Sequence, residues 1–320
     1  MPKKRVLGCS FPVLIGFAAV FVGLLVVGVL TGPMGKNLLG LPAWLIPAKP
    51  HPELPAEVVF HLFSFPITNS IIATWVTIIF LVGVSFLVTR RLTLVPGRRQ
   101  SLLEFILEAL LNFCKSVAGE KNGRRFFPIV ATIFLFVGFN AWLNLLPGYG
   151  SILLHTSEGE VHLLRGANTD INTPLAVALI SFVFVEYFGL RALGFRYLKK
   201  FINVGGLVSS LRLIMHGKMK AGFSGLMTGL INVFIGVLET LSEFIRIVSF
   251  TFRLFGNMTA GEILLMVAVF LIPWAAAVVF YGLELLVGFV QSLIFAGLTL
   301  IFMTIAVAAH GEHSGESAHH

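Results

Sequence analysis

Long apolar runs alternate with short polar segments along this chain of 320 residues. Four of the runs reach the ~20 residues that a helix needs to cross the hydrocarbon layer of a bilayer. They cover 11–31, 68–89, 126–147 and 171–190, and the only charged residue among them is Glu186. The pattern predicts four membrane helices before residue 191.

Two longer apolar stretches, 222–270 and 277–308, complete the pattern. We expect a turn between them at 271–276, because Pro273 disfavours a continuous helix. At about 1.5 Å per residue the two helices would be ~73 Å and ~48 Å long, whereas the hydrocarbon layer is ~30 Å thick. The lengths predict a long, strongly tilted helical hairpin. The expected fold class is an all-α polytopic membrane protein with about six membrane helices.

Residues 101–119 have a different pattern, in which apolar residues recur at helical spacing with Glu104, Glu108 and Lys115 between them. This spacing indicates an amphipathic helix. Such a helix can lie on the cytoplasmic surface of the membrane, which we expect here. It can also pack against the rest of its own chain, and the sequence does not separate the two.

The composition agrees with a membrane protein. Hydrophobic residues make up 57% of the chain and charged residues only 12%, whereas about a quarter of the residues of an ordinary soluble domain are charged. The composition excludes a soluble globular enzyme, a disordered chain and a disulfide scaffold. Cys9 and Cys114 are far apart and form no CxxC motif, so the sequence indicates no zinc or redox site.

The basic residues predict the orientation in the membrane. The net charge is +8, and most of the 23 Lys and Arg fall within 3–5, 90–125 and 191–220. An excess of basic residues in every second polar segment is typical of a membrane protein, whose cytoplasmic loops are rich in Lys and Arg. Because the basic residues lie between apolar runs and do not follow one solvated face, they argue against a nucleic-acid partner. We therefore expect both chain ends in the cytoplasm, with 32–67 and 148–170 outside.

The chain divides into three parts in this interpretation. Residues 1–54 form an N-terminal extension with one membrane helix, 55–308 form the main domain, and 309–320 form a polar, disordered tail. The helix at 11–31 has the basic start of a signal peptide, but its apolar run exceeds the ~7–15 residues of a signal peptide core. We therefore expect a retained helix.

Six ionisable residues lie in the apolar hairpin: Glu239, Glu243, Arg246, Arg253, Glu262 and Glu284. A charge in the middle of a bilayer costs at least ~2.5–3.5 kcal/mol, so such residues indicate a functional site. The first four are separated by 4, 3 and 7 residues, which places them on one helix face. At a spacing of i and i+3, Glu243 and Arg246 can pair.

Arg253 is different, because no acidic residue lies within four positions of it. Its guanidinium cannot lose its charge, so it needs an anion from elsewhere. The candidates are Glu262, Glu284 or a carboxylate on another subunit, and an internal salt bridge remains an alternative. Asn257 follows Arg253 by one turn, and Gln291 shares a helix face with Glu284, so these residues predict a polar seam. The chain has no phosphate-binding loop of the Walker A type, so it is not expected to hydrolyse nucleotide by itself.

The stretch ETLSEFIRIVSFTFRLFGNMTAGEILLMVAVFLIPW at 239–274 resembles the fifth helix of subunit a of F-type ATP synthases. Its core, RLFGNMTAGE at 253–262, is the most specific part. The resemblance extends through QSLIFAGLTLIF at 291–302 and, more weakly, through LNLLPG at 143–148 and NTDINTPLAVAL at 168–179.

The resemblance implies a proton channel that works against a rotating ring of c subunits. In this family one arginine, matched by Arg253, faces the ring and separates an outer from an inner aqueous half-channel. It attracts the deprotonated ring carboxylate and prevents protons from passing directly between the channels. A permanent charge beside a low-dielectric boundary is suited to this task, and a lysine is less suited because burial can remove its proton.

Other positions are assigned by the same resemblance. Glu262 and Gln291 correspond to outer-channel or arginine-neighbour positions, and Asn257 is the asparagine of the motif. Polar positions near the inner half-channel are matched by Glu239 and Ser249. The remaining candidates for the proton path are Glu284, Glu243, Asn140 and Asn144.

The resemblance also implies the partners and the setting. These are the c-subunit ring, the b subunits of a peripheral stalk, the remaining ATP synthase subunits and the lipid bilayer of a bacterial cell (inner) membrane. The chain would not be an enzyme on its own, and no cofactor or metal is expected. The alternatives are an ion-coupled secondary transporter, although we find no inverted repeat, and a structural membrane scaffold.

Overall fold

The computed structural model describes residues 5–6, 9–33, 56–90, 97–146, 148–156, 159–194, 219–273 and 275–308, with six isolated residues between 194 and 219 (Tyr197, Phe201, Gly205, Ser209, Ser210 and Met215). Most of the predicted extension at 32–54 and the predicted tail at 309–320 lie outside the described residues.

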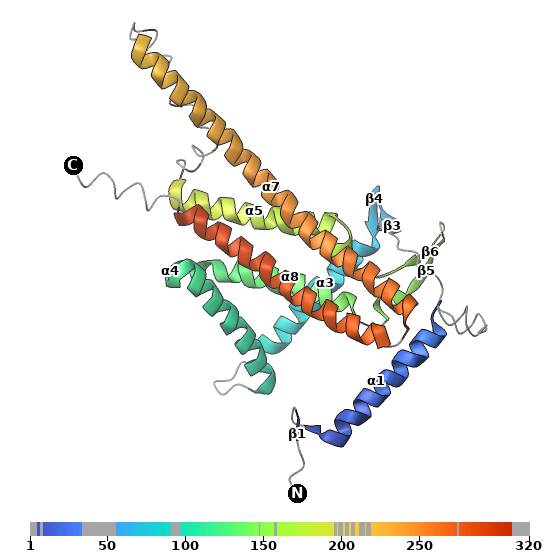
Figure 1. Cartoon of the computed structure of the whole chain (residues 1–320). Helices are drawn as coiled ribbons and strands as arrows, with labels where there is room; N and C mark the ends of the chain where they lie inside the picture. Colours follow the sequence, from blue (N-terminus) through green and yellow to red (C-terminus); the bar gives the residue numbers. More distant parts are fainter. Residues whose placement is uncertain are drawn as a thin grey trace. The chain divides into compact units, whose positions relative to one another are not determined.

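Helices make up most of the described chain (Figure 1). They are α1 (Phe11–Thr31), α3 (Asn69–Thr89), α4 (Arg98–Asn144), α5 (Asn172–Leu193), α7 (Met219–Leu271) and α8 (Ala275–Ala308). Within the described residues, five helices are long and apolar enough to cross a membrane, namely α3, α4, α5, α7 and α8, and the described part of α1 is a shorter apolar helix. The prediction of an all-α polytopic membrane protein is confirmed.

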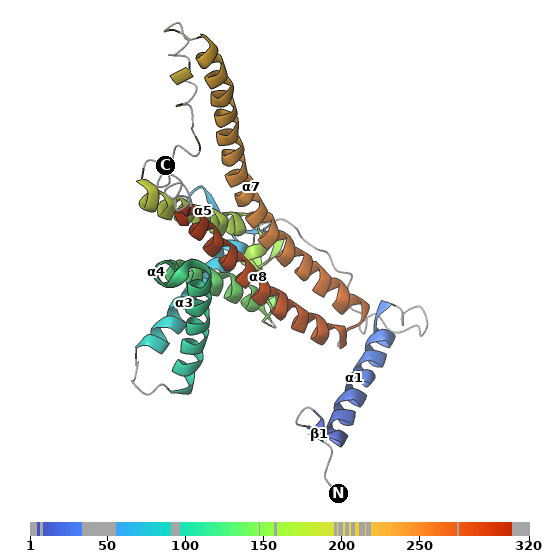
Figure 2. The same cartoon turned by 60° about the vertical axis from the view of Figure 1, so that its left-hand side comes forward.

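The helical hairpin at the C-terminal end is also confirmed. Helix α7 has 53 residues and α8 has 34, and a turn at Ile272 and Pro273 separates them. Near this turn the two helices run antiparallel and side by side in both views (Figure 1, Figure 2). The tilt of this hairpin against a bilayer stays a prediction.

Short strands, which the sequence pattern did not predict, connect the helices. Antiparallel pairs are formed by β1 (Arg5–Val6) with β2 (Cys9–Ser10), by β3 (Val58–Leu62) with β4 (Phe65–Thr68), and by β5 (Leu153–Thr156) with β6 (Gly159–His162). The last two pairs lie in the segments expected outside the membrane. Short 3-10 turns at Tyr149–Ser151 and Ala167–Thr169 flank β5 and β6.

A kink at Gly119 divides α4. Its φ of 78° and ψ of 166° are non-helical, and a positive φ is available to glycine because it has no Cβ. The kink separates the amphipathic segment 101–119 from the apolar segment that follows, which agrees with the prediction of two helices.

The amphipathic part of α4 packs on its own chain with one face. Leu110 and Cys114 are buried, and the Phe113 ring lies against Gly297 of α8. Leu102 and Phe105 on this segment remain exposed. The alternative of a helix packed on its own protein therefore holds for one face, and contact of the other face with the membrane surface stays a prediction.

The described chain forms two compact units, and α3, α4, α7 and α8 contribute to both. Unit 1 contains Met1–Val76, Gly138–Asp170 and Phe255–Val290, and unit 2 contains Thr77–Val137, Ile171–Leu254 and Gln291–His320. In unit 1 the end of α4 packs closely on α8, where the indole Nε1 of Trp142 donates to the Leu285 carbonyl at 3.1 Å.

In unit 2 aromatic and hydroxyl side chains join the helices. Phe250 of α7 stacks against Phe295 of α8 with ring centroids 4.7 Å apart. The hydroxyls of Ser181 on α5 and Thr299 on α8 are 2.7 Å apart. Such buried hydroxyl pairs fix the rotation of neighbouring apolar helices, whose packing alone is less directional.

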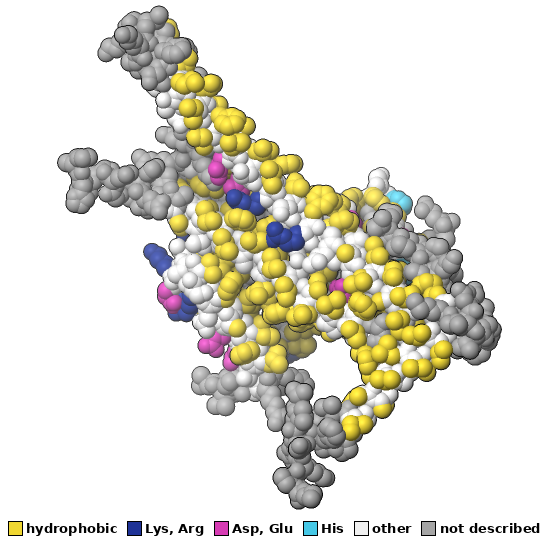
Figure 3. Space-filling view, viewed as in Figure 1, with side chains coloured by type: hydrophobic (Ala, Val, Ile, Leu, Met, Phe, Trp, Pro, Cys, Tyr) yellow, Lys and Arg dark blue, Asp and Glu magenta, His cyan; other side chains and the backbone are white. Residues whose placement is uncertain are grey.

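Hydrophobic side chains dominate the visible surface of the helices, and basic side chains interrupt them along α7 (Figure 3). The exposed apolar residues of α3 include Ile79, Val82 and Leu87. A soluble protein rarely exposes so much continuous apolar area, so this surface agrees with contact to lipid.

Candidate functional site

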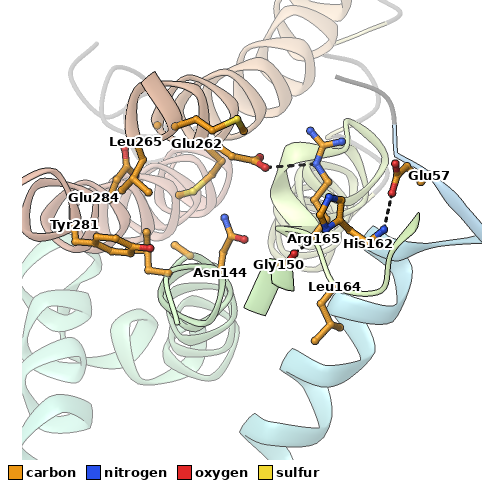
Figure 4. Close-up of a pocket in the computed structure, with 15 residues that line it drawn as sticks. Glu57, Asn144, Gly150, His162, Leu164, Arg165, Glu262, Leu265, Tyr281 and Glu284 are labelled. Carbon is orange, nitrogen blue, oxygen red and sulfur yellow. Dashed lines mark hydrogen bonds and ion pairs between the residues drawn. The ribbon is translucent and has the colours of Figure 1, made fainter. Parts of the chain in front are cut away.

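Unit 1 contains a cavity of about 490 Å³ that is open to the surface (Figure 4). Its wall is built from the residue before β3, the end of α4, the loop after β6, and the facing parts of α7 and α8. The polar and ionisable residues that line it are Glu57, Asn144, His162, Arg165, Glu262, Tyr281 and Glu284. The structure therefore brings together three residues that the sequence singled out, Asn144, Glu262 and Glu284.

Glu262 projects from α7 toward Arg165 in the loop that follows β6 (Figure 4). The guanidinium Nε lies 3.7 Å from the carboxylate Oε1, and the two side chains are 13% and 25% exposed. Partial burial strengthens such a pair relative to a fully solvated one. The pair holds the loop against α7 at the wall of the cavity.

A second group of contacts lies on the same side of the cavity as Arg165 (Figure 4). The carboxylate of Glu57 accepts a hydrogen bond from the backbone N–H of His162 at 3.0 Å and another from the Asn69 amide at 3.4 Å. The ring Nδ1 of His162 is 2.7 Å from the carbonyl of Gly150. These bonds join the start of α3 to the β5–β6 hairpin and so position the loop that carries Arg165.

Glu284 reaches the cavity from α8 across a glycine of α7. A Cβ added at Gly261 would overlap the Glu284 carboxylate, so the absence of a side chain at position 261 creates the space that this carboxylate occupies. One turn further on, Gly288 lies close to Ala141 of α4, where an added Cβ would come within 2.9 Å of the alanine Cβ. Gly288 thus allows the close approach of α8 to α4, and Gly261 leaves room for the Glu284 carboxylate.

The cavity is large enough to hold water. At ~30 Å³ per liquid water its volume holds on the order of ten molecules, and carboxylates separated by water can exchange protons. Among the described residues no group of three or more His, Cys, Asp and Glu side chains is arranged to hold a metal ion.

Asn140 and Asn257 do not line the cavity. Asn140 is buried within α4, and Asn257 is exposed on α7. Of the two predicted asparagines of α4, only Asn144 lines the cavity.

Arg253 lies on α7 in unit 2 and is partly exposed. Its Nη2 donates to the hydroxyl of Ser249 at 3.5 Å, and its guanidinium carbon is 5.7 Å from the centroid of the Phe250 ring. Among the described residues of unit 2, no carboxylate lies within 4.0 Å of this guanidinium. The Arg253 charge thus has no carboxylate partner among the described residues of its own unit, as the spacing predicted.

Glu243 and Arg246 form the ion pair that their spacing predicted. The Arg246 Nη1 lies 2.6 Å from the Glu243 Oε2, and the Glu243 side chain is only 5% exposed. The Arg246 guanidinium also stacks on Phe302 of α8 at 3.9 Å. Glu243 is therefore part of an ion pair within α7, and the stacking of Arg246 on Phe302 joins this pair to α8.

A further polar contact lies at the end of α5, where the phenol of Tyr197 donates to Glu186 at 3.2 Å. Burial, together with the neighbouring carboxylate, raises the pKa of Tyr197, so this phenol keeps its proton at neutral pH. The remaining predicted residues of unit 2 differ in exposure: Gln291 is buried, Glu239 is half-buried and Ser249 is exposed.

Sequence reasoning missed Glu57, His162, Arg165 and Tyr281 as cavity residues. The first three lie in polar segments between membrane helices, where ionisable residues are common and carry no special signal. Their shared feature is a position within the two segments predicted to be outside. Only the fold brings these segments to the same cavity as Glu262.

Comparisons with known proteins agree with this architecture. A family model described as ATP synthase A chain matches residues 71–304. The chain is 34% identical over 245 residues to ATP synthase subunit a of Gloeobacter violaceus, covering 77% of this chain and 86% of that protein. It is 28% identical over 260 residues to ATP synthase subunit a of Moorella thermoacetica, covering 80% and 98%. It is 32% identical over 257 residues to ATP synthase subunit a 2 of Bradyrhizobium sp. strain BTAi1, covering 80% and 96%.

The fold and the cavity define a multi-pass α-helical membrane protein with a cavity lined by ionisable residues between its helices. The family match covers well over half of the chain, and a relative above 30% identity is covered over most of its length. The chain belongs to the ATP synthase A chain family, the family of the proton-translocating membrane subunit of ATP synthases.

Proposed function

We propose that this chain is the stationary proton-channel subunit of a rotary F-type ATP synthase in a bacterial cell membrane. It would provide two aqueous half-channels to the carboxylates of a c-subunit ring, separated by Arg253. Its other partners would be the b subunits of the peripheral stalk and the remaining subunits of the complex. The chain catalyses no reaction alone in this proposal, and its C-terminus lies in the cytoplasm.

The observation that carries the proposal is the environment of the Arg253 guanidinium. This guanidinium belongs to an apolar helix and has no carboxylate within 4.0 Å among the described residues of its unit. A charge in such a place requires a compensating anion. A carboxylate on a moving partner subunit meets this requirement while it is ionised. When it becomes protonated, Arg253 no longer attracts it and it can move away. Protonation would in this way give the movement of the partner a direction.

The cavity of unit 1 is suited to be the outer half-channel. It is lined by Glu262, Glu284 and Asn144. Its wall also includes Glu57 and four residues between 150 and 165. The distribution of basic residues predicts that both of these parts of the chain lie outside the membrane. Water in the cavity would carry protons from the outer side to the membrane interior. Glu239 and Ser249, which precede Arg253 on α7, would belong to the inner half-channel, and Asn257 and Gln291 would lie near the arginine.

Replacing Arg253 by alanine tests the proposal. We expect Arg253→Ala to abolish ATP synthesis driven by a proton gradient in membrane vesicles while the complex still assembles, because the ring carboxylate loses its stationary partner. The matched control is Arg124→Ala, which removes a guanidinium that is 65% exposed and paired with Glu120, and which should leave synthesis unchanged. Normal synthesis in the Arg253→Ala vesicles would defeat the proposal.

Replacing Glu262 by glutamine tests the outer path. We expect Glu262→Gln to slow passive proton flow through the membrane sector, because an amide cannot take up and release a proton and no longer attracts Arg165. The measurement is proton flux through complexes stripped of their catalytic head, at several pH values, with the exposed residue change Glu108→Gln as the control. Equal flux in both variants at every pH would refute an access role for Glu262.

A further inference from the structure

Helix α1 lies outside the residues that the family model matches, so family membership assigns it no role. It has 21 uncharged residues, and at about 1.5 Å per residue it is ~31 Å long, close to the thickness of the hydrocarbon layer. In both views its C-terminal end lies beside the turn between α7 and α8 (Figure 1, Figure 2). All of these parts belong to unit 1.

Two glycines make this contact. Among residues 15–33, only Gly28 and Gly32 are buried. Gly32 directly follows the last residue of α1, and its N–H donates to the Gly28 carbonyl at 2.9 Å, so the two glycines lie on one face at the C-terminal end of the helix. A Cβ added at Gly28 would overlap the carbonyl oxygen of Pro273, and one added at Gly32 would overlap the carbonyl oxygen of Leu271.

The identity of the contacted atoms makes the requirement for glycine strict. Both atoms are backbone carbonyl oxygens, which cannot move aside as the end of a flexible side chain can. Small residues spaced by four positions are a known means of bringing helix backbones close together in a membrane. The glycine pair is thus shaped to fit the α7–α8 turn.

The rest of α1 has the surface of a helix in lipid. Phe17 is 73% exposed, and Val20, Val22 and Val26 are more than half exposed. Gly16 and Gly23 have no atom of another residue close to the position that a Cβ would occupy. Gly28 and Gly32 therefore contact the turn, whereas Gly16 and Gly23 are exposed.

We propose that α1 is retained in the mature protein as a sixth membrane helix, docked through Gly28 and Gly32 on the α7–α8 turn as a clamp. The turns of α7 and α8 next to this contact carry Leu265, Met266 and Tyr281, which line the cavity. The clamp therefore holds the end of the hairpin on which the cavity depends. An effect on proton access rests on the proposed function, whereas retention and docking of α1 do not.

Cleavage of the assembled complex tests the docking. A specific protease site is placed between residues 34 and 55, the complex is purified in mild detergent through a tag on another subunit, and the protease is added. The fragment that contains α1 is then quantified after a second purification. We expect it to remain bound in the otherwise unchanged protein.

Substitution of the glycines provides the matched comparison. Gly28→Leu with Gly32→Leu should lower the retained fraction by about tenfold or more, which corresponds to ~1.4 kcal/mol. Gly16→Leu with Gly23→Leu adds the same apolar volume at positions where a Cβ meets no other atom within 4 Å, and should retain the fragment. Loss of the fragment from the unchanged protein, or equal retention in both double variants, would overturn the proposal.

The mass of the native subunit provides a second, independent test. Mass spectrometry of the subunit purified from its own membranes should give a chain that includes residues 11–31. A mature chain that begins after residue 31 would overturn the proposal. Because neither measurement depends on proton transport, failure of the clamp and failure of the proposed channel function are distinguishable.

Discussion

At the scale of single residues, the two arginines of α7 differ in the groups that compensate their charge. Arg246 is compensated inside its own chain by Glu243 and by the face of Phe302. Arg253, seven positions later on the same helix, has only a hydroxyl and an aromatic ring of its own helix as contacts among the described residues of its unit. The first arginine thus stabilises the helix packing, and the second is open to an external anion.

The buried pair leads to a prediction about stability. We expect Glu243→Ala to destabilise the subunit, because it leaves the Arg246 charge without its carboxylate, and breaking a buried pair costs about 3–5 kcal/mol. The double variant Glu243→Leu/Arg246→Leu removes both charges and should be milder. Thermal inactivation of the purified complex measures both. A double variant less stable than Glu243→Ala would contradict this assignment.

At the scale of elements, the packing of α8 on α7 and on α4 includes positions without a side chain. Gly261 leaves the space that the Glu284 carboxylate fills, and Gly288 allows α8 to approach Ala141. The Glu284 carboxylate therefore occupies space that a side chain at position 261 would fill. A glycine in a helix interior costs ~0.5–1 kcal/mol relative to alanine, so these positions carry a stability cost that the site requires.

Gly261→Ala tests this dependence. We expect the added methyl group to displace the Glu284 carboxylate and to reduce passive proton flux, although alanine favours the helix more than glycine does. Gly282→Ala on α8 is the matched control, because a Cβ at that position meets open space, and its flux should be normal. If the two variants conduct protons equally well, Gly261 does not position Glu284.

Most elements, and some of the candidate site, could be predicted from the sequence. The bounds of the helices follow from runs of apolar residues, because a membrane helix must be continuous and apolar over a fixed length. The Glu243–Arg246 pair follows from a spacing of three. Arg165 and His162 could not be assigned, because their contacts with Glu262 and Glu57 join residues about one hundred positions apart, and helical periodicity carries no information over that distance.

At the scale of the whole molecule, the proposal requires a complex. Among the described residues of its own unit, Arg253 has no carboxylate within 4.0 Å, and α7 has a largely apolar exposed surface that includes Phe244, Ile245 and Phe252. We expect affinity purification of this chain from its native membranes to recover a small hairpin subunit that carries an acidic residue in the middle of a membrane helix. Recovery of the chain as a complete transporter without such a subunit would favour the alternative of a secondary transporter.

The position of Arg253 in the assembled complex tests the central claim most directly. An electron cryomicroscopy structure of the purified complex should show its guanidinium at the surface that faces the ring, within about 4 Å of a ring carboxylate in the deprotonated state. A guanidinium paired with a carboxylate of its own chain and turned away from the ring would contradict the account.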